Sequence, residues 1–539
     1  MMLLVVGLLA VLMAAYDRAR HGILARCTRD AIASRWLPVA LGIISSLSVS
    51  AVWGSWQAPV GIHDERAYVL QARLFATFRW SAPTPPVPIA WEMPHVFLEP
   101  AIFSKYPPGH SLMLTPGIWI GAPALIPILL TGLAGALLFI LARRHADAVV
   151  ASLAWLLWTT SPAMLQWHST YMSQTSTVVL WLLTMLAMST WWQRPSARSA
   201  MGVISGLALM GITRPMSGLM LALPVGGVIL LRSVRAREWR GITYGMMAGI
   251  LISAIVPLWM WRSTGALHEI PYSSYSRYYF PFDLPGFQID TTPAIRALPP
   301  DMQVLSRWTR LLYQGHVPEA MWGNFITRSM AAVQAALSSV TVPLLMCLPV
   351  GLIAFGLRRG GFALTVFVMH VAGYLLMPHG RSWTIYYLEL FPLTALMVAM
   401  GLVSVVRGIK GGTWLPYWMR DTSVSLAHVL LASTMVLLPL MGLQLDDLRR
   451  AHVVPRARQQ QLEQIIEALP NPHAVIFVQR DSLRIPHFIL VGIRGVPTTT
   501  PTWVVRDVGD SLNAVLLREA DGRRPYHLTE RTMTLSPFP

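Results

Sequence analysis

Long apolar runs separated by short polar segments dominate this chain. Runs long enough to cross a membrane occupy 36–54, 122–142, 171–192, 241–261, 330–356, 384–406 and 422–444, and shorter ones occupy 2–16, 148–163, 200–213, 215–231 and 361–377. This pattern predicts an all-α polytopic membrane protein with about twelve transmembrane helices.

The basic clusters between these runs predict which loops lie outside the cytoplasm. With twelve alternating spans, clusters such as 18–35, 232–240 and 407–420 all fall on one side, which the positive-inside rule assigns to the cytoplasm. The loops 55–111 and 263–328 and the tail 446–539 are then expected on the opposite face. We therefore expect a transmembrane domain over 1–445, with these two outer loops.

The tail changes character after residue 445. A helical pattern covers 457–470, β-like runs cover 473–479, 487–492 and 502–506, and another helix is expected to start near Asp510. We therefore predict a small extracytoplasmic α/β domain over 446–539.

Composition supports a membrane protein. Hydrophobic residues make up 54% of the chain, charged residues only 12%, and mean hydropathy is +0.50. The net charge of +17 is assigned to arginines beside anionic membrane lipids, so no nucleic-acid partner is expected.

The stretch HDERAYVLQARLFATF, residues 63–78, places two acidic residues before an amphipathic pattern. A helix from Glu65 to about Phe78 would have a broad apolar face, and we expect it to lie in the membrane interface. Asp64 and Glu65 would meet the positive end of the helix dipole. Asp64 could simply cap the helix, or an ionised carboxylate could act as a general base.

Two cations stand out by position. The chain has only two lysines, and Lys105 lies in SKYPPGHS, before a rigid Pro-Pro-Gly turn; its ammonium suits a phosphate, although a lysine at the membrane interface is an equal alternative. Arg214, in GITRPMSG, lies between two short apolar runs. A buried arginine there is expected to bind an anion, either a ligand or an internal carboxylate.

Other polar and aromatic residues of the outer segments are candidate substrate contacts, although an interfacial aromatic belt predicts the same composition. The candidates are Glu92, His95, Tyr106, His168, Tyr171, Tyr278 and Arg381. The histidines at 63, 95, 110 and 168 show no ligand spacing on one helix, so we predict no metal. No organic cofactor is expected either.

The motifs HDERAYVLQA, WEMPHV before SKYPPGHSL, TRPMSGL, IPYSSYSRYY and WVVRDVGDSLNAVL resemble those of a bacterial branch of the GT-C superfamily of polytopic glycosyltransferases. The resemblance implies transfer of a sugar from a polyprenyl-phosphate donor to a glycan, lipid or protein acceptor on the periplasmic side of the bacterial inner membrane. It implies Asp64, or Glu65 with the register shifted by one, as the base of an inverting reaction. Lys105 matches a lysine near the lipid phosphate, and Arg214 is our second phosphate ligand. Glu92 and His95 match positions of unassigned role.

A lipid or amphiphile transporter, or flippase, is the alternative function. Such a protein is expected to carry ionisable residues near the middle of the bilayer, whereas the charges here gather at the outer face.

Overall fold

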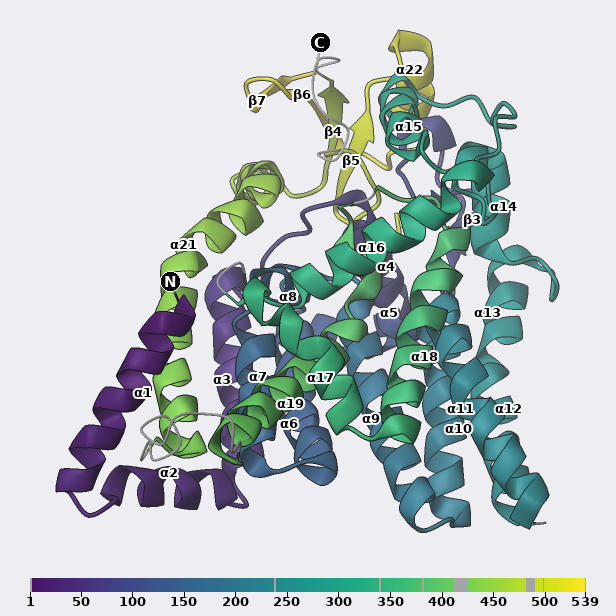
Figure 1. Cartoon of the computed structure of the whole chain (residues 1–539). Helices are drawn as coiled ribbons and strands as arrows, with labels where there is room; N and C mark the ends of the chain where they lie inside the picture. Colours follow the sequence, from purple (N-terminus) through teal and green to yellow (C-terminus); the bar gives the residue numbers. More distant parts are fainter. Residues whose placement is uncertain are drawn as a thin grey trace.

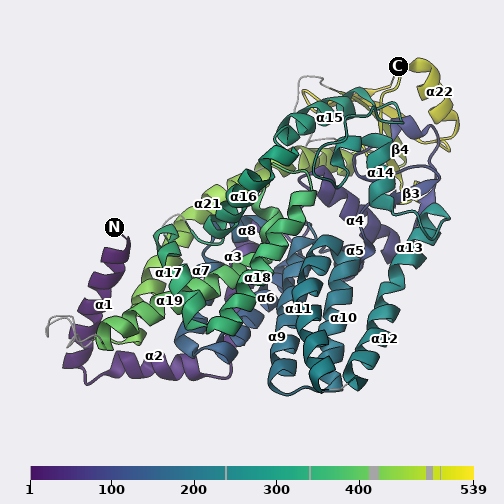
Figure 2. The ribbon, with the colours of Figure 1, turned by 45° about the vertical axis from the view of Figure 1, so that its right-hand side comes forward.

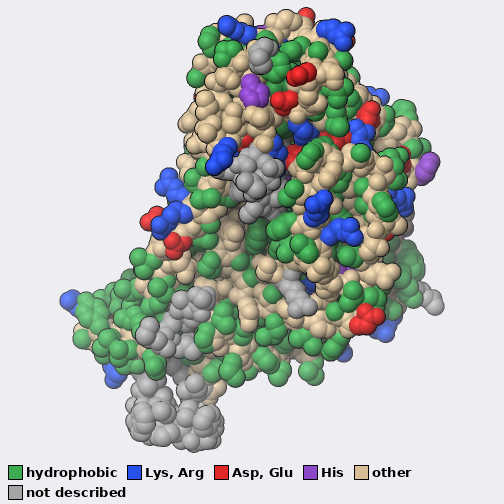
Figure 3. Space-filling view, turned by 90° about the horizontal axis from the view of Figure 1, so that it is seen from above, with side chains coloured by type: hydrophobic (Ala, Val, Ile, Leu, Met, Phe, Trp, Pro, Cys, Tyr) green, Lys and Arg blue, Asp and Glu red, His purple; other side chains and the backbone are tan. Residues whose placement is uncertain are grey.

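The structure is a computed structural model that describes residues 2–236, 239–338, 341–380, 382–411, 424–480, 490–497 and 499–538. Long helices form the lower part of the molecule, and a sheet with short helices caps one end (Figures 1 and 2). Seen from above, charged side chains gather over the capping part, whereas the projection at the left carries mainly hydrophobic ones (Figure 3).

Apolar helices confirm a multi-pass membrane protein. Within the described ranges, seven helical segments are long and apolar enough to span, or nine if each of two bent pairs counts as one span. The seven segments are α6 (Leu125–His145), α9 (Gln174–Gln193), α11 (Pro215–Ala236), α12 (Arg240–Ser253) with α13 (Ile255–Thr264), α18 (Leu357–Gly373) with η5 (Tyr374–Leu376), α19 (Leu390–Gly411) and α21 (Leu426–Glu467).

The bent pairs and the shorter helices complete the bundle. α2 (Ile23–Ala33) and α3 (Leu37–Trp53) meet at 87°, and α7 (Ala148–Thr159) and α8 (Pro162–His168) meet at 66°. α1 (Met2–Ala19) packs along α21, and α10 (Ala197–Thr213) packs between α9 and α12. The count of twelve spans stays a prediction.

The run 330–356 does not form one helix. It divides into the end of α16 (Met321–Ala335), a 3-10 turn η4 (Val342–Met346) and α17 (Cys347–Ala354). Pro343 at the start of η4 lacks a backbone N–H and cannot continue a helix from the preceding residues. The expectation of a single span here is therefore wrong.

The first outer loop folds into a compact unit. It contains α4 (His63–Ala76), β1 (Ala82–Pro83), η1 (Pro88–Ala90), β2 (Val96–Phe97), β3 (Ala101–Ser104) and the start of α5 (Pro108–Trp119). The strands pair in the order β1-β3-β2, with Val96 opposite Ser104. This register brings the residues flanking the hairpin, His95 and Lys105, side by side.

The apolar face of α4 is buried in protein. Ala67, Leu70 and Leu74 pack in one core with Trp91 of the same loop and Trp503 of the tail. Phe78, beyond the helix, is 88% exposed. This face therefore contacts protein, because the first loop and the tail cover it, and the position of the helix in the membrane interface stays a prediction.

The second outer loop adds helices above the bundle. α14 (Pro271–Tyr279) and η2 (Pro281–Asp283) lead through an irregular segment to α15 (Pro300–Tyr313) and η3 (Pro318–Ala320). Tyr275 and Tyr279 of α14 pack with Phe97 and Phe103 of the first loop. The two outer loops thus share a core.

The tail forms a four-stranded sheet in the order β5-β4-β6-β7, in which β4 is parallel to β5 and β6 and β7 is antiparallel to β6. Its elements are β4 (Ala474–Gln479), β5 (Thr502–Arg506), α22 (Asp510–Arg518), β6 (Arg524–Thr529) and β7 (Thr534–Pro537). This confirms the expected strands at 473–479 and 502–506 and the helix near Asp510. Half of the run 487–492 lies outside the described residues, and the described half, 490–492, forms no strand.

One helix joins the transmembrane bundle to the tail. α21 continues from the last span to residue 467, so the boundary expected at 445/446 falls inside it. Figure 1 shows α21 rising from the bundle toward the sheet.

Candidate functional site

Asp64 lies at the centre of a group of polar and aromatic side chains. Its Oδ2 is 2.7 Å from Nδ1 of His63, its Oδ1 is 3.6 Å from Nε2 of His95, and the Tyr106 hydroxyl donates a hydrogen bond to Oδ1. Burial raises the pKa of Asp64, but the charges of His95 and His63, with hydrogen bonds from His63 and Tyr106, outweigh it and hold that pKa well below its usual value. The carboxylate is therefore ionised at neutral pH.

Lys105 enters the same region from the hairpin. The Lys105 backbone N–H donates to the His95 carbonyl at 3.0 Å, which fixes the two residues beside each other. The ammonium is buried, lies 4.4 Å from the Tyr272 ring centroid and forms a 2.9 Å ion pair with Asp283 of η2. The second outer loop thus supplies the carboxylate partner of Lys105.

Arg214 lies where α10 ends and α11 begins. Its Nη1 is 3.4 Å from Oε1 of Glu389, which also accepts a 2.8 Å hydrogen bond from Ser217. Its guanidinium stacks near Tyr374 and Tyr386, at 5.1 and 5.4 Å from the ring centroids. The internal carboxylate considered as a partner for Arg214 is therefore present, and it is Glu389.

Tyrosines connect these charged groups. Tyr106 stacks on Tyr68 with ring centroids 4.4 Å apart, and burial together with Asp64 raises the pKa of Tyr106 well above its usual value. Burial, Asp283 and Asp64 raise the pKa of Tyr386, and Arg214 opposes them. One phenol therefore lies within electrostatic range of two carboxylates and an arginine from three separate parts of the chain.

Glu65 has different partners from Asp64. Its carboxylate accepts hydrogen bonds from the backbone N–H groups of Gly61, Ile62 and Tyr171, and it forms a 2.6 Å ion pair with Arg456 of α21. These contacts close the first turn of α4, so Glu65, and not Asp64, has the capping role. Glu65 is only 1% exposed, whereas the Asp64 side chain is 21% exposed.

Among the expected substrate contacts that the structure describes, His95 and Tyr106 contact Asp64. Glu92 is buried and paired with Arg296, and burial raises its pKa despite that partner. His168 contacts Thr131 at 3.0 Å, and the Tyr171 hydroxyl donates to the Ala58 carbonyl at 2.6 Å. Tyr278 is exposed. Arg381 lies outside the described residues.

Comparison with solved structures shows which fold this chain shares. ArnT from Cupriavidus metallidurans bound to undecaprenyl phosphate superposes with a TM-score of 0.51 at 16% sequence identity, and the match covers 91% of this chain and 90% of that chain. The chain shares the GT-C fold of ArnT. The resemblance in the sequence motifs is thereby confirmed at the level of the fold.

Two further solved structures match more loosely. An oligosaccharyltransferase from Archaeoglobus fulgidus tethered to an acceptor peptide matches at 11% identity and a TM-score of 0.42, over 92% of this chain and 69% of that chain. The arabinofuranosyltransferase AftD from Mycobacteria matches at 15% identity and a TM-score of 0.39, over 87% and 32%. No protein-family model matches the chain, and no curated protein matches its sequence.

Within the GT-C fold, three side chains of this site offer metal-ligating atoms. One atom each from His63, Asp64 and His95 lies within 4.8 Å of the others, and imidazole with carboxylate is a donor set that zinc accepts. His63 and His95 are far apart in sequence, so spacing on one helix could not reveal this group. Nδ1 of His63 lies 2.7 Å from Asp64, a distance that fits a direct hydrogen bond as well as two neighbouring ligands of an ion, so the absence of a metal stays a prediction.

Two carboxylates of the site, Asp283 and Glu389, were not predicted from the sequence. Glu389 is the sole acidic residue in the apolar stretch 384–411. An ionisable residue inside such a stretch is itself a signal of a buried charged partner, so Glu389 could have been found. Asp283 follows an aromatic run in a long loop and carries no comparable signal, because only the folded loop places it beside Lys105.

Proposed function

We propose that the protein is an inverting membrane glycosyltransferase that moves a sugar from a polyprenyl-phosphate donor to an extracytoplasmic glycan, lipid or protein acceptor. Asp64 is the proposed base, and Lys105 and Arg214 are the proposed ligands of the donor phosphate. The observation that carries the proposal is Asp64 itself, an ionised and partly accessible carboxylate in contact with His95, whose carbonyl accepts a hydrogen bond from the Lys105 backbone. The GT-C fold shared with ArnT bound to undecaprenyl phosphate supports a lipid-linked donor.

The proposed chemistry follows from charge. As the bond from the anomeric carbon to the donor phosphate breaks, negative charge grows on the phosphate oxygens, and nearby cations stabilise it. The acceptor hydroxyl attacks the opposite face of the sugar, which inverts the configuration, and its proton passes to Asp64. For Lys105 and Arg214 to bind phosphate, each must share its charge between the phosphate and its present partner, Asp283 or Glu389.

Purified protein in lipid nanodiscs tests this function. Wild type and Asp64→Asn are incubated with a panel of polyprenyl-phosphate sugars and a host membrane extract as acceptor, and release of polyprenyl phosphate is measured. We expect release with wild type and a loss of about 10²-fold to 10⁴-fold with Asp64→Asn. Equal release by both proteins would exclude Asp64 as the base, and no release with any donor would contradict the transferase.

A lipid transporter is the second candidate, and one observation favours it. Glu389 lies within 3.7 Å of His370 and 3.4 Å of Arg214, so a charged group is buried among the apolar helices. In proteoliposomes without acceptor, a transporter would move labelled polyprenyl phosphate between the leaflets, and Glu389→Gln would stop it. We expect no such movement with either protein.

A further inference from the structure

A large cavity lies on the side of α4 away from Asp64. Its volume is about 750 Å³, which is within the size range of small-molecule sites. The end of α3, the loop after it, α4, the segment 449–467 of α21 and residues 490–494 of the tail line it. None of the residues proposed to bind the donor phosphate borders it.

The cavity is strongly basic. Five arginines and two glutamates line it: Arg66, Arg73, Arg449, Arg456, Arg494, Glu463 and Glu467. Glu65 pairs with Arg456, and Glu463 pairs with Arg494. Positive charge therefore remains in excess at the cavity wall.

Arg66 and Arg73 have neutral partners. Arg66 donates to Oε1 of Gln459 at 2.7 Å and to the carbonyls of Leu490 and Val491 at 3.2 and 2.9 Å. Arg73 donates to the carbonyl of Arg494 at 2.6 Å. These oxygens orient the guanidinium groups but do not neutralise them.

The arginines also repel one another. Burial, with the charge of Arg73, lowers the pKa of Arg66 to about 10, and burial with Arg73 and Arg66 lowers that of Arg494 to about 9. Arg73 keeps accessible surface because it borders the cavity. An anion placed between these side chains would relieve the repulsion and accept charge-assisted hydrogen bonds.

Apolar side chains lie among the arginines of the cavity wall. Trp53, Val69, Leu70, Ile118 and Ile493 border the cavity, and the Arg456 guanidinium lies 5.4 Å from the Trp53 ring centroid. A wall that combines apolar and guanidinium groups suits a ring with a charged substituent, because sugar and aromatic faces stack while the anion meets arginine.

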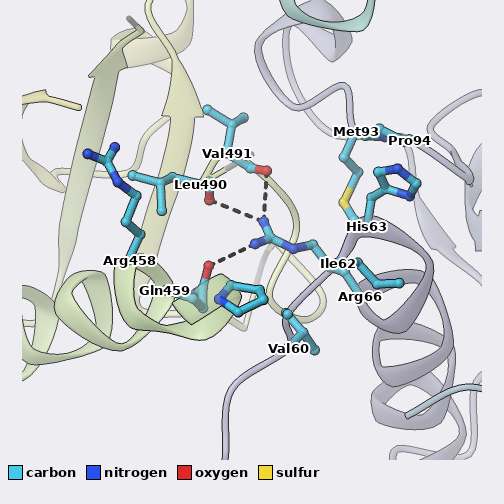
Figure 4. A pocket seen from close by; sticks show the side chains of 12 residues that line it. Val60, Ile62, His63, Arg66, Met93, Pro94, Arg458, Gln459, Leu490 and Val491 are labelled. Atoms are coloured by element: carbon cyan, nitrogen blue, oxygen red, sulfur yellow. Dashed lines mark hydrogen bonds between the residues drawn. The ribbon is translucent and has the colours of Figure 1, made fainter. Parts of the chain in front are cut away.

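Arg66 separates this cavity from the region of Asp64. A smaller pocket on its other side is lined by His63, Met93 and Pro94, and shares Val60, Arg66, Gln459 and Leu490 with the large cavity. Figure 4 shows the Arg66 side chain reaching across toward Leu490, Val491 and Gln459, with His63 on the far side. A sugar chain bound in the cavity would thus be separated by the Arg66 side chain from His63, the residue that contacts Asp64.

We propose that this arginine-lined cavity between α4 and α21 binds an anionic sugar unit of the acceptor, recognised through a phosphate or carboxylate group. The identification of the bound sugar as part of the acceptor rests on the proposed transferase function. It assigns α21 and the tail to acceptor recognition, whereas Lys105 and Arg214 serve the donor.

A binding measurement tests the proposal without turnover. The full chain in nanodiscs is titrated with glucose 6-phosphate, glucuronate and neutral glucose, and saturation-transfer NMR, which detects weak ligands, reports binding. We expect one or both anionic sugars to bind and glucose not to bind. The sugar with the higher affinity identifies phosphate or carboxylate as the natural group.

Arg73→Gln with Arg449→Gln is the test variant, because both side chains are exposed and line the cavity. We expect at least tenfold weaker binding of the anionic sugar. Arg79→Gln with Arg450→Gln is the matched control, with the same charge change at exposed positions just after α4 and within α21 that do not line the cavity. Equal weakening by both variants, or no binding of either anionic sugar to wild type, would overturn the proposal.

The outcome is independent of the donor assay. Asp64→Asn should bind the anionic sugar like wild type, because Asp64 does not line the cavity. If the anionic sugar binds but no donor is turned over, anionic-sugar binding in the cavity is supported and the transferase function is contradicted. If donor is turned over but neither anionic sugar binds, the transferase function is supported and anionic-sugar binding in the cavity is contradicted.

Discussion

Asp64 and Glu65 are neighbours in the chain, yet their carboxylates bind separate sets of partners. Asp64 contacts His63 and Tyr106, whereas Glu65 closes the first turn of α4 and pairs with Arg456 at 2.6 Å. This answers why two acidic residues stand together at the head of that helix. Glu65 joins α4 to α21, and Asp64 belongs to the candidate site.

The two carboxylates should therefore respond differently to replacement. We expect Glu65→Gln to destabilise the protein by about 3–5 kcal/mol, because the buried Arg456 loses its charged partner. Asp64→Asn should lower the unfolding temperature much less while abolishing turnover. Thermal unfolding in detergent, followed by intrinsic fluorescence, measures the difference. A larger destabilisation by Asp64→Asn would reverse the roles.

The acid limb of the activity profile should depend on His95. Because the pKa of Asp64 is depressed in the folded protein, its carboxylate stays ionised as pH falls and protonates only well below the usual range. His95→Gln removes one of the charges that depress this pKa, so the limb should move to higher pH. Donor turnover followed from neutral pH to below about pH 4, the usual range of an aspartate, measures the shift. His168→Gln, at a histidine bound to Thr131, is the control and should leave the limb unchanged.

Lys105 should contribute to donor binding through its charge. We expect Lys105→Met to weaken polyprenyl-phosphate binding about tenfold, as for loss of a charge-assisted hydrogen bond. Asp283→Asn keeps the ammonium and removes its internal competitor, so donor binding should be unchanged or tighter. Binding is measured with a fluorescent polyprenyl phosphate. Equal weakening in both variants would show that the pair acts only as a link between the two outer loops.

Removal of divalent cations should leave donor turnover unchanged. Nδ1 of His63 lies 2.7 Å from Asp64, a distance at which imidazole and carboxylate can form a hydrogen bond without an ion. Turnover before and after dialysis against EDTA is the measurement. Loss of activity that zinc restores would instead assign His63, Asp64 and His95 as ligands.

Local patterns were sufficient to predict individual elements but not how distant elements pack. The amphipathic stretch predicted α4 within about two residues at each end, and short β-like runs rich in valine and aromatic residues predicted β4 and β5. The same stretch could not show that Trp503, more than 400 residues later, covers the apolar face of α4. Pro343 is a helix-breaking residue, but the apolar composition of 330–356 alone was used to predict a single span there.

The candidate site was predictable only in part, because local patterns do not show how distant elements pack. Asp64, Lys105 and Arg214 stand out because each is an unusual residue at its position. Their partners Asp283 and Glu389 come from other segments, and a single sequence without structure gives no measure of which segments meet. The basic cavity was equally hidden, since its arginines come from α4, α21 and the tail.

The continuity of α21 determines how this protein can be dissected. A chain that stopped after residue 445 would keep every apolar span but would lose Arg456 and leave Glu65 as a buried carboxylate without its cation. A fragment that began there would expose the surface that covers α4. The tail is therefore not a detachable module, and limited proteolysis within α21 should inactivate the protein even though no span is removed.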